Sequence, residues 1–191
     1  MDFRAEILPE VALELLNHVK NLSLPIMNIE LWMGPSIPAK IHKAFLDEGS
    51  RITESLVMGC DAPVGFHYSP SKEFRLETFE VQDGPWVNLS DYINCKHLEI
   101  RTDEGHTTYS VNAQSLNQFF KAWQNSSCRL ESLDVFVYHC PEFDFEEVIM
   151  GLNGTNITSD GLLTRLDIEP QDGKKATITL TQIDAKSEIK S

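Results

Sequence analysis

Residues 130–135, Leu130-Glu131-Ser132-Leu133-Asp134-Val135, carry a motif of the form apolar-x-x-apolar-x-apolar. Its last positions alternate between apolar and polar side chains, which is the period of a half-buried β-strand. The motif recurs at residues 19–24, 76–81, 95–100 and 163–168, with a weaker copy around Leu56 and Met58. Recurrence of one strand motif predicts a fold built by repeating one structural unit.

The spacing of the copies is irregular, because their middle positions are separated by as few as 19 residues (98 − 79) and as many as 35 (133 − 98). An ordinary mixed α/β domain in which the repetition is accidental therefore remains an alternative. The same apolar pattern in each predicted strand favours repeats, because leucine-rich repeats are detected by such a recurring pattern.

Segments with helical spacing lie between the copies. The clearest contains Leu116, Phe119, Phe120 and Trp123, which fall on one helical face, and Asn112 is a suitable N-cap for it. A second helix is predicted to start at Asp144, which resembles a capping box with Glu147, while Phe143 and Val148 have the spacing of a hydrophobic staple.

Two further helices are predicted in the first part of the chain. One runs from Ser36 and Pro38 to about Glu48, and Gly49 is expected to end it. The other begins near Pro9 and is expected to bury the apolar side chains at positions 11, 15 and 16, namely Val11, Leu15 and Leu16.

The predicted fold is α/β: an irregular leucine-rich-repeat-like stack of short strands and helices, closed by a C-terminal β-hairpin. The hairpin is indicated by Asp172-Gly173 between two strand-like runs, since both central residues of such a turn need a positive φ. We expect one domain over residues 1–183, followed by a polar C-terminal tail over 184–191.

Charge and composition restrict the function. The 191 residues include 16 Lys and Arg against 29 Asp and Glu, a formal net charge of −13. This balance argues against nucleic acid and anionic membranes as partners and favours basic ones. We find no signal peptide and no apolar run long enough for a membrane span.

The cysteines indicate the compartment. Cys60, Cys95, Cys128 and Cys140 are scattered, which is typical of buried thiols in a reducing environment, so the expected localisation is cytoplasmic, nuclear or both. Several Asn-x-Ser/Thr sequons occur, and without an entry signal they are read as coincidence.

No catalytic, cofactor or metal site is predicted, because the chain lacks the phosphate-binding, dinucleotide-binding, zinc-protease and nucleophile-elbow motifs. The acidic cluster Glu142, Asp144, Glu146 and Glu147 fits helix capping better than acid catalysis. A carboxylate-dependent hydrolase at this cluster is the one enzymatic alternative. His139–Cys140 and Cys95–His97 lack the spacing of metal ligands.

Protein binding has the better candidates. If Leu133, Val135 and Val137 point into the core, the alternate side chains of that strand point outward. The same register exposes further residues on the neighbouring strands. The predicted contact surface comprises Glu80, Gln82, Glu99, Arg101, Asp134, Phe136, Tyr138, Asp167 and Glu169. Outward Phe136 and Tyr138 are suited to a contact hot spot, unless a helix or loop covers them. Trp86, in a Gly-Pro-Trp loop, is expected to be a packed anchor.

Two stretches resemble a known family. Residues 116–123, Leu-Asn-Gln-Phe-Phe-Lys-Ala-Trp, lead into Arg129-Leu130-Glu131-Ser132-Leu133, and residues 172–178 read Asp-Gly-Lys-Lys-Ala-Thr-Ile. Together they resemble the nematode type-2 F-box-associated domain, over about residues 75–181. The loop after Trp123 lacks the glycine that the family pattern leads us to expect.

The resemblance implies a non-catalytic receptor that uses no cofactor. In such proteins an F-box docks on a Skp-type adaptor of a cullin-based ubiquitin ligase, and the associated domain holds the target protein. The stretch starting at Leu8-Pro9-Glu10 echoes the opening of an F-box, but residues 25–32 lack its continuing helical pattern, so residues 9–24 are read as the first helix and strand of the repeat. A free-standing binding protein without ligase docking is therefore the alternative.

Overall fold

The computed structural model describes residues 2–3, 8–22, 26–32, 37–70, 74–82, 86–102, 112–125, 129–138, 144–159, 163–168 and 176–183. The helices in these parts are α1 (Pro9–Asn21), α2 (Ala39–Ile52), the 3-10 helix η1 (Leu89–Tyr92), α3 (Ala113–Gln124) and α4 (Phe145–Ile149). The strands are β1 (Asp2–Phe3), β2 (Ile26–Leu31), β3 (Thr53–Met58), β4 (Thr78–Val81), β5 (His97–Thr102), β6 (Ser132–Tyr138), β7 (Gly154–Ser159), β8 (Leu163–Ile168) and β9 (Ala176–Ile183). The chain is therefore a mixed α/β protein, as its sequence predicts.

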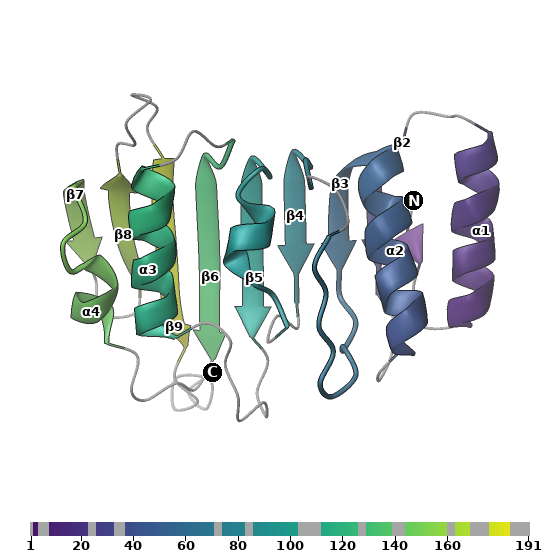
Figure 1. Ribbon diagram of the computed structural model, residues 1–191, viewed down its shortest axis with the longest axis horizontal. Coiled ribbons are helices and arrows are strands. Elements are labelled where there is room, and N and C mark those ends of the chain that lie inside the picture. The colour runs from purple at the N-terminus through teal and green to yellow at the C-terminus, as the bar shows by residue number, and fades with distance from the viewer. Residues whose placement is uncertain are drawn as a thin grey trace, which may run out of the picture.

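The described strands form one sheet, in which the order from β1 to β6 is the order of the chain. Every pair in this series is parallel, and β9 adds to β6 in parallel as well. The sheet ends with β8 and β7, which pair antiparallel. The described helices lie on one face of the sheet (Figure 1), so its two faces differ in character.

Alternate strand residues build the core beneath the helices. Those on β2 to β6 are each at most 1% exposed: Ile29, Leu31, Leu56, Met58, Phe79, Val81, Leu98, Ile100, Leu133 and Val135. Successive side chains of a strand point to opposite faces, so the residues between them lie on the face away from the helices. We call this second face the open face.

Helix α3 begins as its sequence predicts. Asn112 Oδ1 accepts a hydrogen bond from the backbone N–H of Ser115 at 2.8 Å, and Ser115 Oγ accepts one from the N–H of Asn112 at 3.0 Å. This reciprocal capping box satisfies two N–H groups that a helix start leaves unpaired. The predicted apolar face is buried against the sheet, including Phe120 and Trp123.

The N-cap half of the capping box predicted for α4 is also confirmed. Asp144 Oδ1 accepts the backbone N–H of Glu147 at 3.3 Å, and negative charge at this end complements the helix dipole. The staple residue Phe143 lies outside the described residues.

Two predictions about the first helices are wrong. Gly49 does not end α2, which continues to Ile52. A Cβ on Gly49 would lie 3.3 Å from Leu56 Cδ1, so the glycine permits close packing of the helix on β3. In α1, Leu16 is buried, but Val11 and Leu15 are 43% and 42% exposed because α1 lies at the N-terminal end of the row of helices (Figure 1).

The first copy of the strand motif was also misplaced. Residues 19–22 are not part of a strand, because α1 extends through Asn21 and Leu22 follows it as the C-cap. The strand lies further on, at Ile26–Leu31, and pairs with β3 from Ile26 opposite Thr53 to Leu31 opposite Met58. The helical preference of residues 9–21 outweighs the short strand motif at their end.

The last copy, at β8, is a strand but does not continue the parallel series. It pairs antiparallel with β9, from Leu163 opposite Thr181 to Ile168 opposite Ala176. The Asp172-Gly173 turn predicted between these strands lies outside the described residues, as does the tail after residue 183.

Candidate functional site on the open face of the sheet

Carboxylates line up across the open face. The parallel register places Glu30 opposite Val57, Val57 opposite Glu80, Glu80 opposite Glu99, and Glu99 opposite Asp134. We call Glu30, Glu80, Glu99 and Asp134 the acidic row. Neighbouring strands lie about 4.8 Å apart. Three of these carboxylates therefore occupy consecutive strands, β4, β5 and β6, without an intervening cation in the row.

The electrostatics of the row are visible at Glu80. Partial burial raises the pKa of the Glu80 carboxyl, and the negative charge of Glu99 raises it further. The charge of Arg101 and a hydrogen bond from Gln82 act in the opposite direction, and Glu30 adds a smaller increase to this pKa. The net effect is a raised pKa of Glu80, so burial and the neighbouring carboxylates make the ionised form of Glu80 less favourable.

A second row lies on the same face, two residues further towards the carboxyl ends of the strands. It contains Trp32, Gly59, Gln82, Arg101 and Phe136. Backbone hydrogen bonds continue the sheet to its first members: the Gly59 N–H donates to the Leu31 carbonyl at 2.7 Å and the Gln82 N–H to the Met58 carbonyl at 2.9 Å. Arg101 and Phe136 are directly opposite each other.

Members of the second row orient the carboxylates of the first. Trp32 Nε1 donates to Glu30 Oε2 at 3.2 Å, and Asn28 Nδ2 donates to Glu30 Oε1 at 2.7 Å. Gln82 Nε2 donates to Glu80, and Arg101 Nε donates to Glu99 Oε1 at 2.6 Å. Each donor except Asn28 is two residues after its acceptor, where the strand returns to the same face.

Trp32 depends on the glycine beside it. A Cβ on Gly59 would lie 2.2 Å from Trp32 Cε3 and 2.6 Å from Cζ3. The indole ring therefore lies directly over the backbone of Gly59, and a larger residue there would displace the ring. This contact fixes an aromatic surface next to Glu30.

Asp134 and Phe136 form the other end of the two rows. The guanidinium carbon of Arg101 lies 4.8 Å from the centre of the Phe136 ring, a cation–π contact. Asp134 forms neither a hydrogen bond nor an ion pair with the described part of the chain. Next to Asp134, on β9, the position in line with the row is occupied by Thr179. Arg165 of β8 lies opposite Thr179 on its other side.

Six of the nine predicted contact residues lie in these two rows and are half-buried: Glu80, Gln82, Glu99, Arg101, Asp134 and Phe136. Tyr138 is the last residue of β6, opposite Ile183, and its side chain is outside the described residues, as is all of Glu169. Asp167 lies on β8 opposite Thr177, which pairs with Ser132, so it belongs to an adjacent row.

Sequence reasoning missed Glu30 and Trp32. The misplaced first strand hid both, although Ile29 and Leu31 give the same alternation as the other strands. No sequence signal pairs Trp32 with Gly59, because that contact depends on the register of β2 and β3.

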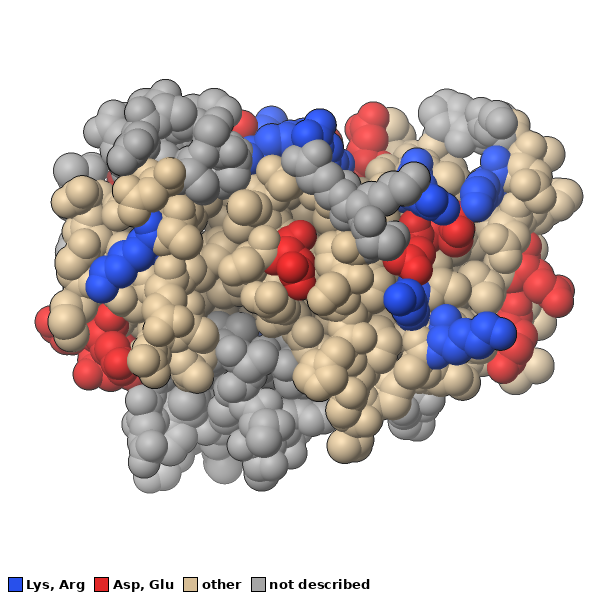
Figure 2. Space-filling view, in the orientation of Figure 1, with Lys and Arg blue, Asp and Glu red and all other residues tan. Residues whose placement is uncertain are grey.

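The helical face carries its charges differently. Figure 2 shows acidic and basic side chains intermingled near α1 and α2. Glu48 of α2 pairs with Lys20 of α1 and with Arg51, at 3.2 Å for the latter. These pairs lower the pKa of Glu48, the reverse of the situation at Glu80.

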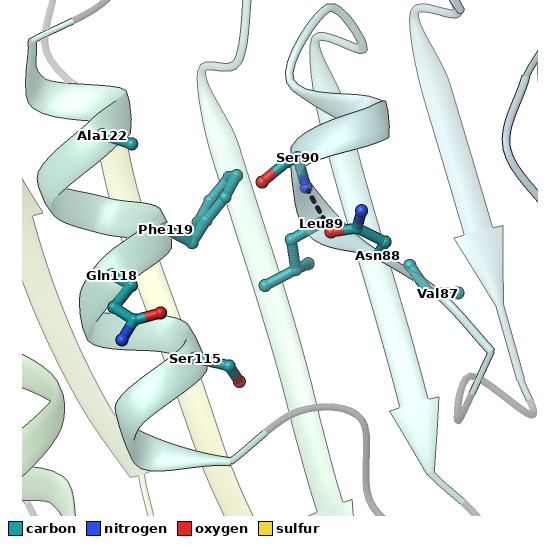
Figure 3. A pocket seen from close by; sticks show the side chains of 8 residues that line it. All are labelled: Val87, Asn88, Leu89, Ser90, Ser115, Gln118, Phe119 and Ala122. Atoms are coloured by element: carbon teal, nitrogen blue, oxygen red, sulfur yellow. Dashed lines mark hydrogen bonds between the residues drawn. The ribbon is translucent and has the colours of Figure 1, made fainter.

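A groove also lies on the helical face. It has a volume of about 350 Å³ and lies between η1 and α3, lined by Val87, Asn88, Leu89, Ser90, Ser115, Gln118, Phe119 and Ala122 (Figure 3). Two of its polar side chains serve local structure: Asn88 Oδ1 accepts the N–H of Ser90, and Ser115 belongs to the capping box of α3.

The described residues offer little chemistry elsewhere. Burial raises the pKa of the Cys95 thiol to about 11, so it stays protonated at neutral pH, and His97 Nδ1 lies 2.8 Å from Ser132 Oγ. Within the described ranges no three His, Cys, Asp or Glu residues are placed to hold a metal ion. No helix among them could cross a membrane. Trp86 is 6% exposed and packs as the predicted anchor.

Fold and surface together define a mixed α/β domain with a helical face for packing and a polar open face. Comparison with known families adds one finding: residues 72–135 match the family model described as F-box associated. The resemblance found in the sequence is confirmed over this range, which ends before the Asp172-Gly173 motif. No significant match was found among curated proteins or solved structures.

Proposed function

We propose that this chain is a non-catalytic protein-binding module that holds a target protein on the open face of its sheet. The observation that carries this proposal is the position of the family match. Residues 72–135 contain β4, β5 and the start of β6, the strands that bear Glu80, Glu99 and Asp134. F-box-associated domains are binding domains of F-box proteins, and here the matched segment contributes most of the acidic row.

The setting we propose is a substrate receptor of a cullin-type ubiquitin ligase in the cytoplasm or nucleus. The open face would hold the target, and an F-box in the same product would dock on a Skp-type adaptor. This setting follows from the family resemblance, which supplies the ligase partners that the surface itself does not identify.

For the architecture we propose an irregular leucine-rich-repeat-like stack closed by a C-terminal hairpin through Asp172-Gly173. The chain-order parallel strands β1 to β6 and the placement of the described helices on one face support it. Repeat folds of this kind present extended surfaces to their partners.

A second candidate is a free-standing binding protein that occupies targets without delivering them. One observation favours it. The segment that echoes an F-box opening forms α1, and the chain then enters the sheet as β2, with α1 packed on α2. These residues are part of the binding domain instead of a separate docking helix bundle.

The test is capture of partners from a lysate of the source organism, with the chain as bait. The proposal expects a protein partner whose capture is reduced by substitutions on the open face and unchanged by substitutions on α1. Absence of any specific protein partner, or a partner that tolerates the open-face changes, contradicts it. Binding of purified Skp-type adaptor then separates the two candidates.

A further inference from the structure

We propose that the open face recognises a basic segment of its partner, with Arg side chains placed against the acidic row between the rings of Trp32 and Phe136. This inference rests on the proposed function and adds the chemistry of the partner.

The first feature is an excess of negative charge: Arg101 pairs with Glu99, but the acidic row holds four carboxylates. Glu80, Glu99 and Asp134 lie on adjacent strands in register, and like charges directly across a sheet are destabilising. Arg101 lies one row away, and Arg165 lies beyond Thr179. A cation supplied from outside would relieve this repulsion, whereas a neutral or acidic segment would not.

The second feature is orientation. Trp32, Gln82 and Arg101 donate hydrogen bonds to Glu30, Glu80 and Glu99, so these carboxylates are held in place before a partner arrives. A carboxylate that is already fixed loses less conformational freedom on binding. Asp134 receives no such hydrogen bond from the described residues, so it is the member of the row most available to a new ion pair.

The third feature is the pair of aromatic rings, with Trp32 next to Glu30 and Phe136 next to Asp134. Arg101 already shows how the surface receives a guanidinium, because it bonds Glu99 and lies over the Phe136 ring. A planar guanidinium can satisfy a carboxylate and an aromatic face together, and an ammonium does so less well. The surface is therefore suited to Arg above Lys.

The fourth feature is contrast with the helical face. There the single carboxylate of Glu48 is paired with two cations, Lys20 and Arg51. On the open face Arg101 pairs with Glu99, while Glu80 and Asp134 form no ion pair with a described residue. The attraction for cations is consequently a property of the open face and not only of the net charge of −13.

The experiment measures binding of short fluorescein-labelled peptides to the whole chain by fluorescence anisotropy. One peptide alternates Arg and Ser, a second replaces Arg with Lys, and a third replaces Arg with Glu. We expect the Arg peptide to bind most tightly and the Glu peptide not to bind. Replacing Glu80→Gln, Glu99→Gln and Asp134→Asn together should weaken Arg-peptide binding by about tenfold or more.

The matched control makes the same change of net charge away from the row. Glu10 and Glu14 on α1 and Glu146 on α4 are exposed, and replacing all three with Gln should change binding less than about twofold. Equal loss in the two triple variants, or unchanged binding in the open-face variant, would overturn the inference. So would binding of the Glu peptide. Circular dichroism confirms that each variant is folded.

Failure of this inference can be told apart from failure of the proposed function. If the chain captures a partner through the open face but shows no preference for the Arg peptide, only the basic-segment inference falls. If it captures no protein partner at all, the proposed function falls, whatever the peptides do.

Discussion

The two faces of the sheet are made by the same strands, yet they obey opposite rules. On the helical face, alternate residues are apolar and nearly unexposed, and rings pack against one another: Phe79 stacks on Tyr92 with centroids 5.0 Å apart. On the open face the neighbouring residue of the same strand, Glu80, lies in a row of like charges. One face is arranged for stability, and the other keeps an arrangement that stability alone disfavours.

The largest expected effect lies on the helical face. Phe79 is fully buried and contacts both Phe74 and Tyr92. Phe79→Ala removes these contacts and leaves a cavity, so the free energy of unfolding should fall by about 3–5 kcal/mol in urea denaturation. A loss below about 1 kcal/mol would show that this face is not packed as described. The adjacent Glu80→Gln serves as the matched comparison.

Second in size is a pH effect at His42, which is buried among rings, 4.6 Å from Phe66 and 5.3 Å from Trp86 between centroids. Neither ring nitrogen has a hydrogen-bond partner in the described structure. Burial lowers the pKa of His42 from 6.5 to about 4. The unfolded chain therefore binds this proton more readily, and stability present above pH 6.5 is lost as the pH falls towards 4.

The predicted loss from this group is on the order of 3 kcal/mol. It is measured as the pH dependence of unfolding free energy in the native chain minus that in His42→Leu, which lacks the titrating group. Because all other titrating groups are common to the two proteins, the difference between the two profiles isolates the contribution of His42. A His42→Leu profile parallel to the native one contradicts the prediction.

A third, smaller effect concerns the open face. Gly59→Ala places a methyl group where the Trp32 ring lies, and the resulting displacement should destabilise the fold by about 1–3 kcal/mol. Iodide quenching of tryptophan fluorescence should rise, because Trp86 and Trp123 are buried and Trp32 is the partly exposed member. In a Trp32→Ala background the same glycine substitution should be almost neutral. Additive effects would show that the two residues do not contact.

The sequence predicted this difference between faces better than it predicted the elements themselves. Alternation within each strand motif was enough to assign Glu80, Glu99 and Asp134 to the outward side, because a strand has only two faces. The alternation could not place Glu30, because the strand was expected at residues 19–24, where α1 extends through Asn21. The contact of Trp32 with Gly59 depends on register between β2 and β3, which no local pattern contains.

The same reasoning explains the exposed side of α1. Helical spacing showed that Val11, Leu15 and Leu16 lie near one another. It did not show that α1 would lie at one end of the row of described helices. A side chain between two helices is buried, whereas one at the end of a row is not. Position within the layer is a tertiary property, and local periodicity carries no information about it.

The smallest predicted effect is a gain in stability, whereas the preceding substitutions lower it, and it tests the difference between the two faces most directly. The pKa of Glu80 is raised, so the folded chain holds this proton more tightly than the unfolded chain, and stability is lost as the pH rises above the ordinary value of 4.5. Glu80→Gln cannot lose a proton and should therefore be more stable than the native chain at pH 7. Because the side chain is partly exposed and its charge is screened, the expected gain is about 0.2–1 kcal/mol.

The control is Glu77→Gln, immediately before the same strand. Glu77 pairs with Arg129 and Lys96, the latter at 3.7 Å, so its replacement should lower stability slightly at pH 7. Urea denaturation at pH 7 measures the change in unfolding free energy for both variants and so shows whether each one is stabilised or destabilised. Destabilisation by Glu80→Gln would mean that the acidic row is a structural network. A gain in stability together with weaker binding of the Arg peptide would mean that the row is kept for its partner.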